Sequence, residues 1–275
     1  MSFSVNTNSG AMIALEDLNA TQQQMSQTQN RVSTGLSVAT AKDNGAVWAI
    51  AQNERAQISA LDSVKSSLNR GSSIVDVALS AGQSVSDLLN QMKAQALSAS
   101  DTSLDASSRQ ALSVDFAQLR DQIAKVVQSA SFDGANLLDA GAQSLAFLAN
   151  ADGTSTLTVQ AQSMALGGSI VTVTAAASLA TATIAANLIN VVQSSITNVN
   201  QALASLGTSS NQLTLQTTSV LDLQDTLTTG VGNLVDANMA KESAQLQALQ
   251  TKQQLGVQAL SIANQAPQIL LSLFK

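Results

Sequence analysis

The sequence predicts a mainly α protein: a long antiparallel helical bundle or coiled coil built from both termini, with a small β-hairpin region at the middle of the chain. Apolar residues near both ends recur at alternating intervals of three and four, which is the coiled-coil repeat. Hydrophobic residues make up 45% of the chain but aromatic residues only 2%, which suits a thin bundle of interdigitating aliphatic side chains. An Asp-Gly turn between two short apolar runs predicts the hairpin.

The first helix is predicted from the heptad pattern that begins near residue 11. Two polar residues, Gln22 and Gln29, interrupt its apolar seam. The full seam consists of Ala11, Leu15, Leu18, Gln22, Met25, Gln29, Val32 and Leu36. Gly35 is predicted to end this helix, because glycine adopts the left-handed backbone of a helix C-terminus without strain.

A second and longer helix is predicted from about Gly45 to Ser98, after a short polar segment at 39–44. Its apolar seam contains Ile58, Leu61, Leu68, Val75, Leu79 and Leu89. A polar turn at 100–108 follows, in which Asp105 is the candidate N-cap of a third helix that runs to about Ser129. A helix of about 50 residues spans roughly 75 Å, which is far longer than a globular core needs.

The pattern changes between the third helix and the next helical segment. Phe132-Asp133-Gly134 is typical of a turn. Residues 145–148 and 156–159 are short extended candidates joined by an Asp-Gly turn, so they predict a hairpin. Residues 161–182 are rich in Ala, Ser, Thr and Gly and only weakly patterned, which favours a surface connection.

Helical periodicity returns near Thr183 and is predicted to stop at about Ser205, before Gly207. A last, long helix follows, with a seam through Leu213, Val220, Leu227 and Leu234. After a one-residue shift the seam continues through Val235, Met239, Leu246, Leu249, Gln253, Gly256, Leu260 and Ala263. Pro267 is expected to end or kink this helix.

Both chain ends carry heptads and the middle does not, so the simplest arrangement pairs the ends with each other. We expect a terminal helical coiled-coil domain from residues 1–44 and 235–275, and an outer helical domain at 45–234 with a hairpin near 144–160. Long apolar seams lose area to water unless other copies cover their outer faces. The pattern therefore favours a subunit that polymerises, although intramolecular packing alone would give the same spacing.

Several classes of function are excluded by composition. The chain has no Cys and no His, so disulfides, cysteine-rich zinc sites, and thiol or imidazole catalysis are absent. Its net charge is −6 and no Lys or Arg lies between Lys125 and Lys241, which argues against binding to nucleic acid or anionic membranes. Asp101 and Asp105 share a polar turn without a partner base, so capping is favoured over acid–base catalysis. We therefore expect no enzyme activity, no cofactor and no metal.

Neither a signal peptide nor a membrane span is expected from the two ends. No apolar core with a basic start precedes Arg31. The uncharged stretch at 253–274 is interrupted by Gln258, Asn264, Gln265, Pro267 and Gln268.

Motifs at both ends resemble bacterial flagellins. Near the start these are Asn6-Thr7-Asn8 with Ala14-Leu15, and Arg31-Val32-Ser33-Thr34-Gly35-Leu36 followed by Ala41-Lys42-Asp43, Ala46 and Ala49-Ile50-Ala51. Phe132-Asp133-Gly134-Ala135-Asn136-Leu137-Leu138 is similar to the family's turn before its hairpin. The end, Ala263-Asn264-Gln265-Ala266-Pro267-Gln268 with Leu270, Leu271, Leu273 and Phe274, resembles the family's C-terminus. The resemblance covers about residues 1–160 and 185–275, with the motifs in order, which makes it highly specific.

The resemblance implies that the terminal segments line the inner tube of an extracellular filament used for motility, and that the next segments form an outer domain. It implies a short flagellin without large outer domains, secreted unfolded through a type III export apparatus. The partners that it implies are other copies of the chain, sibling flagellins, hook-associated and cap proteins, and a flagellin chaperone. An uncleaved N-terminus without Cys fits that route.

Residues predicted at the subunit interface combine the seam with the family motifs. They are Ala11, Leu15, Leu18, Met25, Val32, Leu36, Lys42, Asp43, Met239, Leu246, Leu249, Leu260, Leu270, Leu271, Leu273 and Phe274. Lys42 and Asp43 are open to two interpretations, a solvated pair or a subunit contact. Ser and Thr residues of 154–183 are likewise either O-glycosylated, as in some flagellins, or plain solvated surface.

Two segments depart from the family pattern. Gln91-Met92-Lys93-Ala94-Gln95 stands where the family often has an Arg-rich segment read by the innate-immune flagellin receptor, so the resemblance does not carry that recognition over to this chain. Asn233-Leu234-Val235-Asp236-Ala237-Asn238 replaces an Arg-containing run near the other end. Two alternatives to a filament subunit stay open: a hook–filament junction protein, which shares the terminal helices, and a secreted helical effector or enzyme.

Overall fold

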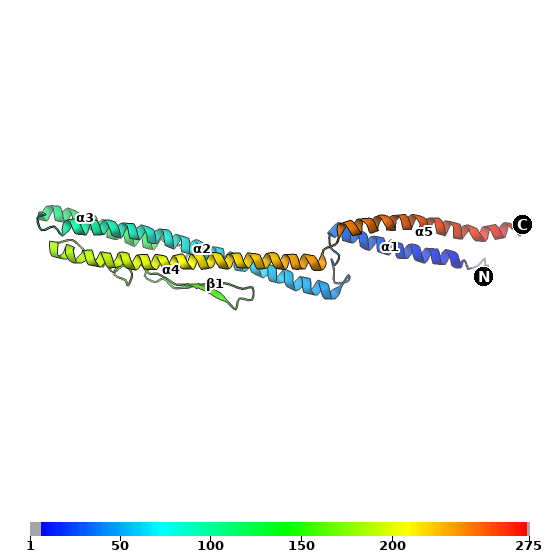
Figure 1. Ribbon diagram of the computed structural model, residues 1–275, viewed down its shortest axis with the longest axis horizontal. Coiled ribbons are helices and arrows are strands. Elements are labelled where there is room, and N and C mark those ends of the chain that lie inside the picture. Colours follow the sequence, from blue (N-terminus) through cyan, green and yellow to red (C-terminus); the bar gives the residue numbers. More distant parts are fainter. Residues whose placement is uncertain (1–6, 274–275) are drawn as a thin grey trace. The chain divides into compact units, whose positions relative to one another are not determined.

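The computed structural model describes residues 7–273, with side chains described for residues 7–265 (Figure 1). Within this range the elements are α1 (Ser9–Thr34), α2 (Gly45–Ala99), α3 (Ala106–Ser129), β1 (Leu145–Leu148), β2 (Thr156–Val159), α4 (Ala182–Val235) and α5 (Met239–Leu273). The predicted mainly α fold with a small hairpin is confirmed. The chain divides into two compact units, a terminal unit of residues 1–56 and 226–275 and a middle unit of residues 57–225.

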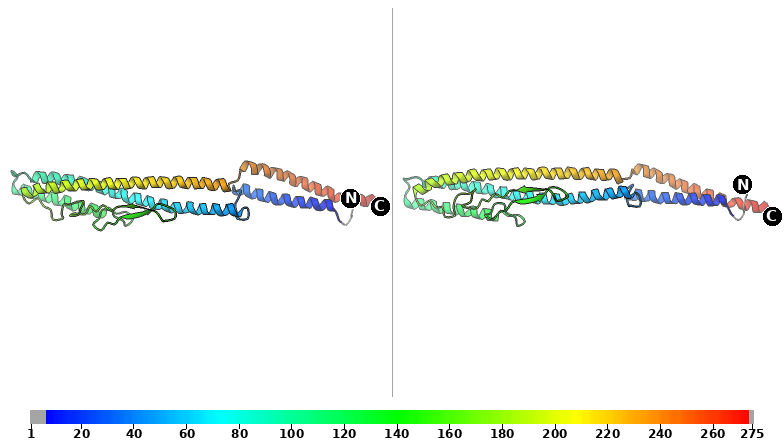
Figure 2. Two further views of the ribbon diagram at one scale, coloured as in Figure 1. Left: turned by 60° about the horizontal axis from the view of Figure 1, so that its bottom comes forward. Right: turned by 90° about the horizontal axis from the view of Figure 1, so that it is seen from below.

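In the terminal unit, α1 and α5 pack side by side and run in opposite directions (Figures 1 and 2). The Asn8 side chain accepts a hydrogen bond from the Ala11 N–H and so caps α1. Gly35 ends the helix with a φ of 72°, as its left-handed propensity predicts. The Asn8 Nδ2 also donates to the Ala263 carbonyl oxygen at 2.6 Å, which joins the start of α1 to the last turns of α5.

The middle unit is a helical bundle with a continuous apolar core. Figure 2 shows α2 and α4 running alongside one another, and the bond from Lys93 Nζ to Gln193 Oε1 at 2.6 Å joins them. α3 turns back beside α2 after a tight connection. The fully buried side chains include Leu61, Leu68, Leu89, Met92, Phe116, Ile123, Leu206 and Leu213. This packing gives the middle unit a closed interior of its own.

The hairpin packs on the helices of the middle unit. β1 and β2 pair antiparallel, with Phe147 opposite Leu157. Phe147 and Val159 face inward, and the Phe147 ring lies over Gly71 of α2, where any Cβ would come within 3.0 Å of the ring. The predicted strands at 145–148 and 156–159 are therefore confirmed, and a glycine in α2 makes room for them.

Residues 161–182, which follow the hairpin, pack against the helices of the middle unit, so the prediction of a surface connection there is wrong. We call this segment the strap. Its side chains Met164, Val171, Val173 and Leu179 are fully buried. Its backbone is satisfied by side chains of neighbouring helices: the Thr172 N–H donates to Ser195 Oγ, and the Leu179 N–H to Ser113 Oγ. The sequence does not indicate this burial, because the buried residues of the strap are spread among Ala, Ser and Thr.

The helix break predicted before Gly207 is also wrong, since α4 continues through that glycine to Val235. Burial of Leu206 and Leu213 on either side outweighs the helix penalty of one glycine, which is about 1 kcal/mol. The chain breaks instead at 236–238, where Asn238 caps α5 by accepting from the Lys241 N–H. The one-residue shift of the heptad at Leu234 and Val235 marks this break in the sequence. α5 in turn continues through Pro267 to Leu273.

Candidate assembly interface

The seam between α1 and α5 follows a different phase from the predicted one. Ala14 is half-buried and Thr21 and Thr28 are buried, so these three residues lie on the side of α1 that faces α5. Leu15, Gln22 and Gln29 are exposed. Both phases share Ala11, Leu18, Met25 and Val32, which are buried or half-buried. A buried threonine is tolerated at position 21 because its hydroxyl donates to the Asp17 carbonyl oxygen at 2.8 Å. The prediction that Leu15 and Gln29 lie in the seam is therefore wrong, whereas Gln22, although exposed, is hydrogen-bonded to Gln253 across the seam.

This phase leaves large apolar side chains uncovered at one end of the α1–α5 pair. Met12 is 66% exposed, Ile13 61% and Ile262 69%. We call the whole group the apolar end; it consists of Met12, Ile13, Leu15, Leu255, Val257 and Ile262. A shallow groove runs along α1 here, lined by Ser9, Met12, Ile13, Leu15, Glu16, Asn19, Ala20 and Gln23.

Two hydrogen bonds show that the residues of the apolar end lie at the same level of the helix pair. One joins Asn8 to the Ala263 carbonyl, and the other joins Gln253 Nε2 to Gln22 Oε1 at 2.6 Å. All members of the apolar end lie between these two bonds. Farther along, no large apolar side chain is exposed over residues 16–34 of α1 or 240–254 of α5. Apart from Met239 at the start of α5, the exposed large apolar side chains described on the two helices thus all belong to the apolar end.

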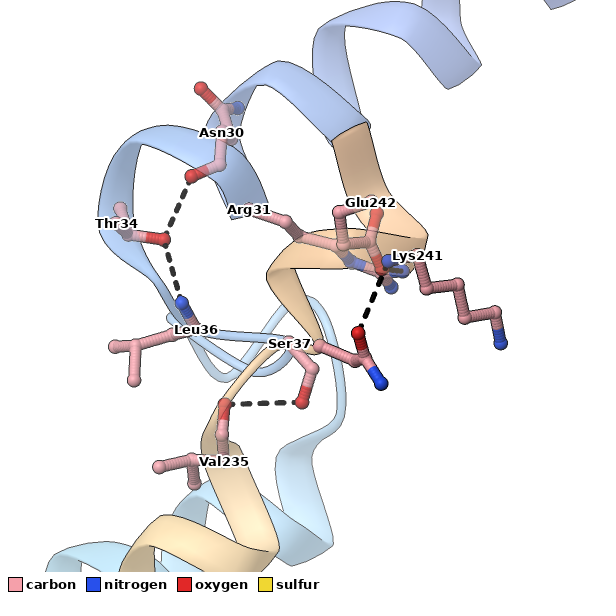
Figure 3. Close-up of polar contacts among 9 residues, drawn as sticks. Asn30, Arg31, Thr34, Leu36, Ser37, Val235, Lys241 and Glu242 are labelled. Atoms are coloured by element: carbon pink, nitrogen blue, oxygen red, sulfur yellow. Dashed lines mark hydrogen bonds and ion pairs between the residues drawn. The ribbon is translucent and has the colours of Figure 1, made fainter. Parts of the chain in front are cut away.

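At the opposite end of the pair, the two connecting segments form a short clasp. Leu36 and Asp236 make an isolated antiparallel bridge, with the Ser37 N–H donating to the Val235 carbonyl at 2.7 Å and the Ala237 N–H to the Gly35 carbonyl at 2.8 Å. Figure 3 shows Arg31 and Glu242 pointing toward one another from α1 and α5, and their Nη1 and Oε1 atoms are 3.5 Å apart. Glu242 is buried although it is ionisable.

Asp43 organises the turn between α1 and α2. Its Oδ2 accepts from the backbone N–H groups of Ala39 and Thr40 and from the Thr40 hydroxyl. Hydrogen bonds from the Thr40 backbone and side chain lower the pKa of Asp43 below its ordinary value. Lys42 and Asp43 are both exposed. Within one copy, Asp43 thus has a structural partner, and the interpretation of this pair as a subunit contact stays a prediction.

The residues predicted at the subunit interface fall into four groups. Ala11, Leu18, Met25, Val32, Leu246, Leu249 and Leu260 lie in the seam of one copy; Leu15, Lys42, Asp43 and Met239 are exposed; Leu36 is in the clasp. The side chains of Leu270, Leu271, Leu273 and Phe274 lie outside the described residues. Met12, Ile13, Leu255, Val257 and Ile262 were not predicted, because a choice of seam phase decides which apolar residues are left outside.

Across the residues that the structure describes, no group of three or more acidic residues could hold a metal ion. Asp105 accepts from the Ser108 N–H at 2.6 Å and caps α3, as predicted. No helix within the described range is long and apolar enough to cross a membrane.

Comparison with known protein families identifies the family to which this chain belongs. The model of the bacterial flagellin N-terminal helical region matches residues 5–143, and that of the C-terminal helical region matches residues 189–274. The chain belongs to the flagellin family. This flagellin is 52% identical to flagellin FljM and 51% identical to flagellin FljO of Caulobacter vibrioides, each over 99% of this chain and 98% of the relative. The crystal structure of Bacillus cereus flagellin aligns with a TM-score of 0.49 and 22% identity, over 55% of this chain and 86% of that chain.

Flagellins are structural subunits of the bacterial flagellum, so this chain is a subunit of the extracellular flagellar filament used for motility and is not an enzyme. It polymerises with copies of itself and with sibling flagellins. No finding favours the alternative of a hook–filament junction protein. This flagellin is a short form, as expected from the sequence, because only residues 144–188 separate the two matched helical regions.

Proposed function

We propose that the α1–α5 pair is the element through which flagellin subunits join, and that its apolar end is the surface covered by neighbouring copies. In this proposal residues 1–44 and 235–275 line the inner tube of the filament, and residues 45–234 form the outer domain. The observation that carries it is the position of the apolar end, with Met12, Ile13 and Ile262 more than 60% exposed.

The terminal unit has far fewer buried apolar side chains than the middle unit. Among the described side chains of the terminal unit, the buried apolar ones are Met25, Ala51, Val231, Val235 and Leu249. A pair of helices with so small an interior gains little from folding alone, since ordering each residue costs about 1–2 kcal/mol. Covering a side chain of the apolar end by another copy adds on the order of 1 kcal/mol. Assembly therefore supplies stability that the single subunit lacks.

The contact between copies is heterologous in this proposal: the α1 side of the apolar end meets a different surface on the next copy. Contacts between unlike surfaces do not close on themselves and therefore extend into open helical polymers. The predicted interface residues Leu15 and Met239 belong to the exposed surface. On the sequence pattern alone, the proposal also keeps Leu270, Leu271, Leu273 and Phe274 as interface residues. Lys42 and Asp43 contribute polar contacts near the clasp.

Further partners follow from the same route of assembly. We infer that the chain passes unfolded through the flagellar export apparatus, held beforehand by a flagellin chaperone, and that it is added beneath cap proteins onto hook-associated proteins. The lack of Cys supports this inference, because no disulfide obstructs threading. The weakly stabilised terminal unit also offers a chaperone apolar segments that are not locked in a core.

Seeded filament growth tests the proposal. A truncated chain without residues 256–275 lacks Val257 and Ile262 of the apolar end. It should not extend wild-type seeds, while the unfolding temperature of its middle unit should stay that of the wild type. Ile262→Gln is the point variant, and Ser261→Gln at an exposed neighbouring position is its matched control. Growth should fall about tenfold in Ile262→Gln and stay near wild type in Ser261→Gln, as expected for loss of a buried aliphatic side chain. Filaments of normal length from the truncated chain would refute the proposal.

A further inference from the structure

The seam between α1 and α5 contains little information about how far one helix should slide along the other. Ala11, Ala14, Thr21 and Thr28 are small or polar, and the half-buried positions of α5 include Gln253, Gly256 and Ala263, which are also small or polar. A shift by one heptad would bring these small or polar positions against similar ones, so they discriminate only weakly between registers. The larger apolar residues of the seam, such as Leu18 against Gly256, contribute to the register, and a buried polar contact can add to what they set.

Glu242 occupies a seam position, four and seven residues before Leu246 and Leu249. Its side chain is only 8% exposed, and its described ion-pair partner is Arg31, whose side chain is 32% exposed. Glu242 Oε2 and Arg31 Nε are buried and have no hydrogen-bond partner among the described residues. A single contact at 3.5 Å with two unsatisfied atoms is poorly suited to adding stability. It does penalise any register in which the buried carboxylate would lose its only cation.

A more ordinary interpretation is that Glu242 merely complements the dipole of α5, since it lies in the first turn of that helix. An exposed acidic residue would serve the dipole equally well, so that interpretation leaves the burial of Glu242 unexplained. The backbone bonds of the clasp cannot replace the ion pair. N–H and C=O groups are the same in every residue, so the bridge between Leu36 and Asp236 could form again after a slip.

We propose that the Arg31–Glu242 pair sets the register of α1 against α5 and thereby brings the two halves of the apolar end to the same level. Glu242 is a positioning residue for assembly: it acts through the alignment of Met12 and Ile13 with Val257 and Ile262. Buried polar residues that specify register at a cost in stability are known from coiled coils. This inference rests on the proposed function of the apolar end.

Charge reversal in seeded filaments tests the pair. The variants are Arg31→Glu, Glu242→Arg and the double reversal, and Lys241→Glu is the control because it reverses an exposed charge next to Glu242. Register is read from disulfide formation, which the natural chain without Cys permits. Gln22→Cys with Gln253→Cys reports the observed register, since these side chains are hydrogen-bonded. Gln29→Cys with Gln253→Cys reports a slip of one heptad.

Each single reversal should lower growth from wild-type seeds at least about tenfold, and the double reversal should restore it to within about threefold, as a coupled pair requires. In filaments, the single reversals should favour the 29–253 disulfide and the double reversal the 22–253 disulfide. The proposal is overturned if the single reversals grow normally with the 22–253 disulfide, if the double grows no better than the worse single, or if Lys241→Glu impairs growth equally. The two proposals can be told apart. Normal growth of Ile262→Gln would refute the proposed function, whereas the 22–253 and 29–253 disulfide yields test the register separately.

Discussion

The Leu18 side chain of α1 lies against Gly256 of α5, where a Cβ built on the glycine would be 3.4 Å from Leu18 Cδ1. This glycine lets the two helices approach closely at this point of the seam. Gly256 lies between Leu255 and Val257, so the contact falls within the apolar end, the surface proposed to be covered by neighbouring copies.

Gly256→Leu should therefore impair assembly, because the larger side chain forces α1 and α5 apart and shifts the apolar end. Gly256→Ala is the matched control: 3.4 Å is an ordinary contact, and alanine favours the helix by about 1 kcal/mol. Seeded growth followed by light scattering should be strongly slowed in the leucine variant and at least normal in the alanine variant. Equal growth of both variants would contradict a close-packed seam.

Gly71 and Gly207 should respond in opposite ways to the same substitution. A Cβ at Gly71 would meet the Phe147 ring at 3.0 Å, so Gly71→Ala should destabilise the middle unit by about 1–3 kcal/mol through overpacking. Gly207 lies within α4 with nothing inside 4 Å of an added Cβ, so Gly207→Ala should stabilise it by about 1 kcal/mol. Denaturant unfolding followed by circular dichroism measures both. A destabilised Gly207→Ala would argue against the continuous helix.

Arg109 closes the connection between α2 and α3. Its guanidinium donates to the carbonyl oxygens of Ala99, Asp101 and Leu104 at 3.0, 2.8 and 3.1 Å. Arg109→Ala should cost about 1.5–3 kcal/mol of unfolding free energy, because bonds from a charged donor to backbone acceptors are lost. Arg109→Lys should recover only part of it, since lysine lacks the planar fork. Arg70→Ala, which removes an exposed 3.8 Å pair with Asp133, is the control and should change stability by no more than about 1 kcal/mol.

Acid should weaken the middle unit through Asp105. A hydrogen bond from the Ser108 N–H lowers the pKa of Asp105 in the folded state below its ordinary value, which is about 3.9 in unfolded chains. The resulting stability is present above that unfolded value and is lost as the pH falls through the folded pKa. Asp105→Asn keeps a capping oxygen but does not titrate, so its unfolding free energy should depend less on pH between about 2 and 5. Identical pH profiles for both chains would contradict this assignment.

Local chemistry explains which parts of the fold the sequence predicts. Gly35 and Asp105 act through their own backbone or the next turn, so the C-terminal end of α1 and the start of α3 follow from a few residues. The Asp152-Gly153 turn likewise determines where the hairpin reverses. The strap could not be predicted, because burial of Val171 and Val173 depends on helices distant in the sequence.

The candidate interface was predictable in location but not in detail. Heptads at both ends predict that α1 and α5 pair, yet positions 14 and 15 fit the repeat equally well, and hydrophobicity favours Leu15 over Ala14. In the structure the smaller residue is half-buried and Leu15 is exposed. No local signal links Arg31 with Glu242, since 211 residues separate them and either one reads as an ordinary helix-surface charge.

The most direct test of the account is the accessibility of the apolar end before and after polymerisation. A single Cys at Ile262 can be labelled with a maleimide in monomers and in filaments, since the natural chain has no Cys. Thr154→Cys, in the exposed hairpin turn, is the reference position. The account predicts that labelling at position 262 falls at least about tenfold on polymerisation, relative to position 154, as a buried interface requires. Equal labelling of Ile262→Cys in monomers and filaments would contradict it.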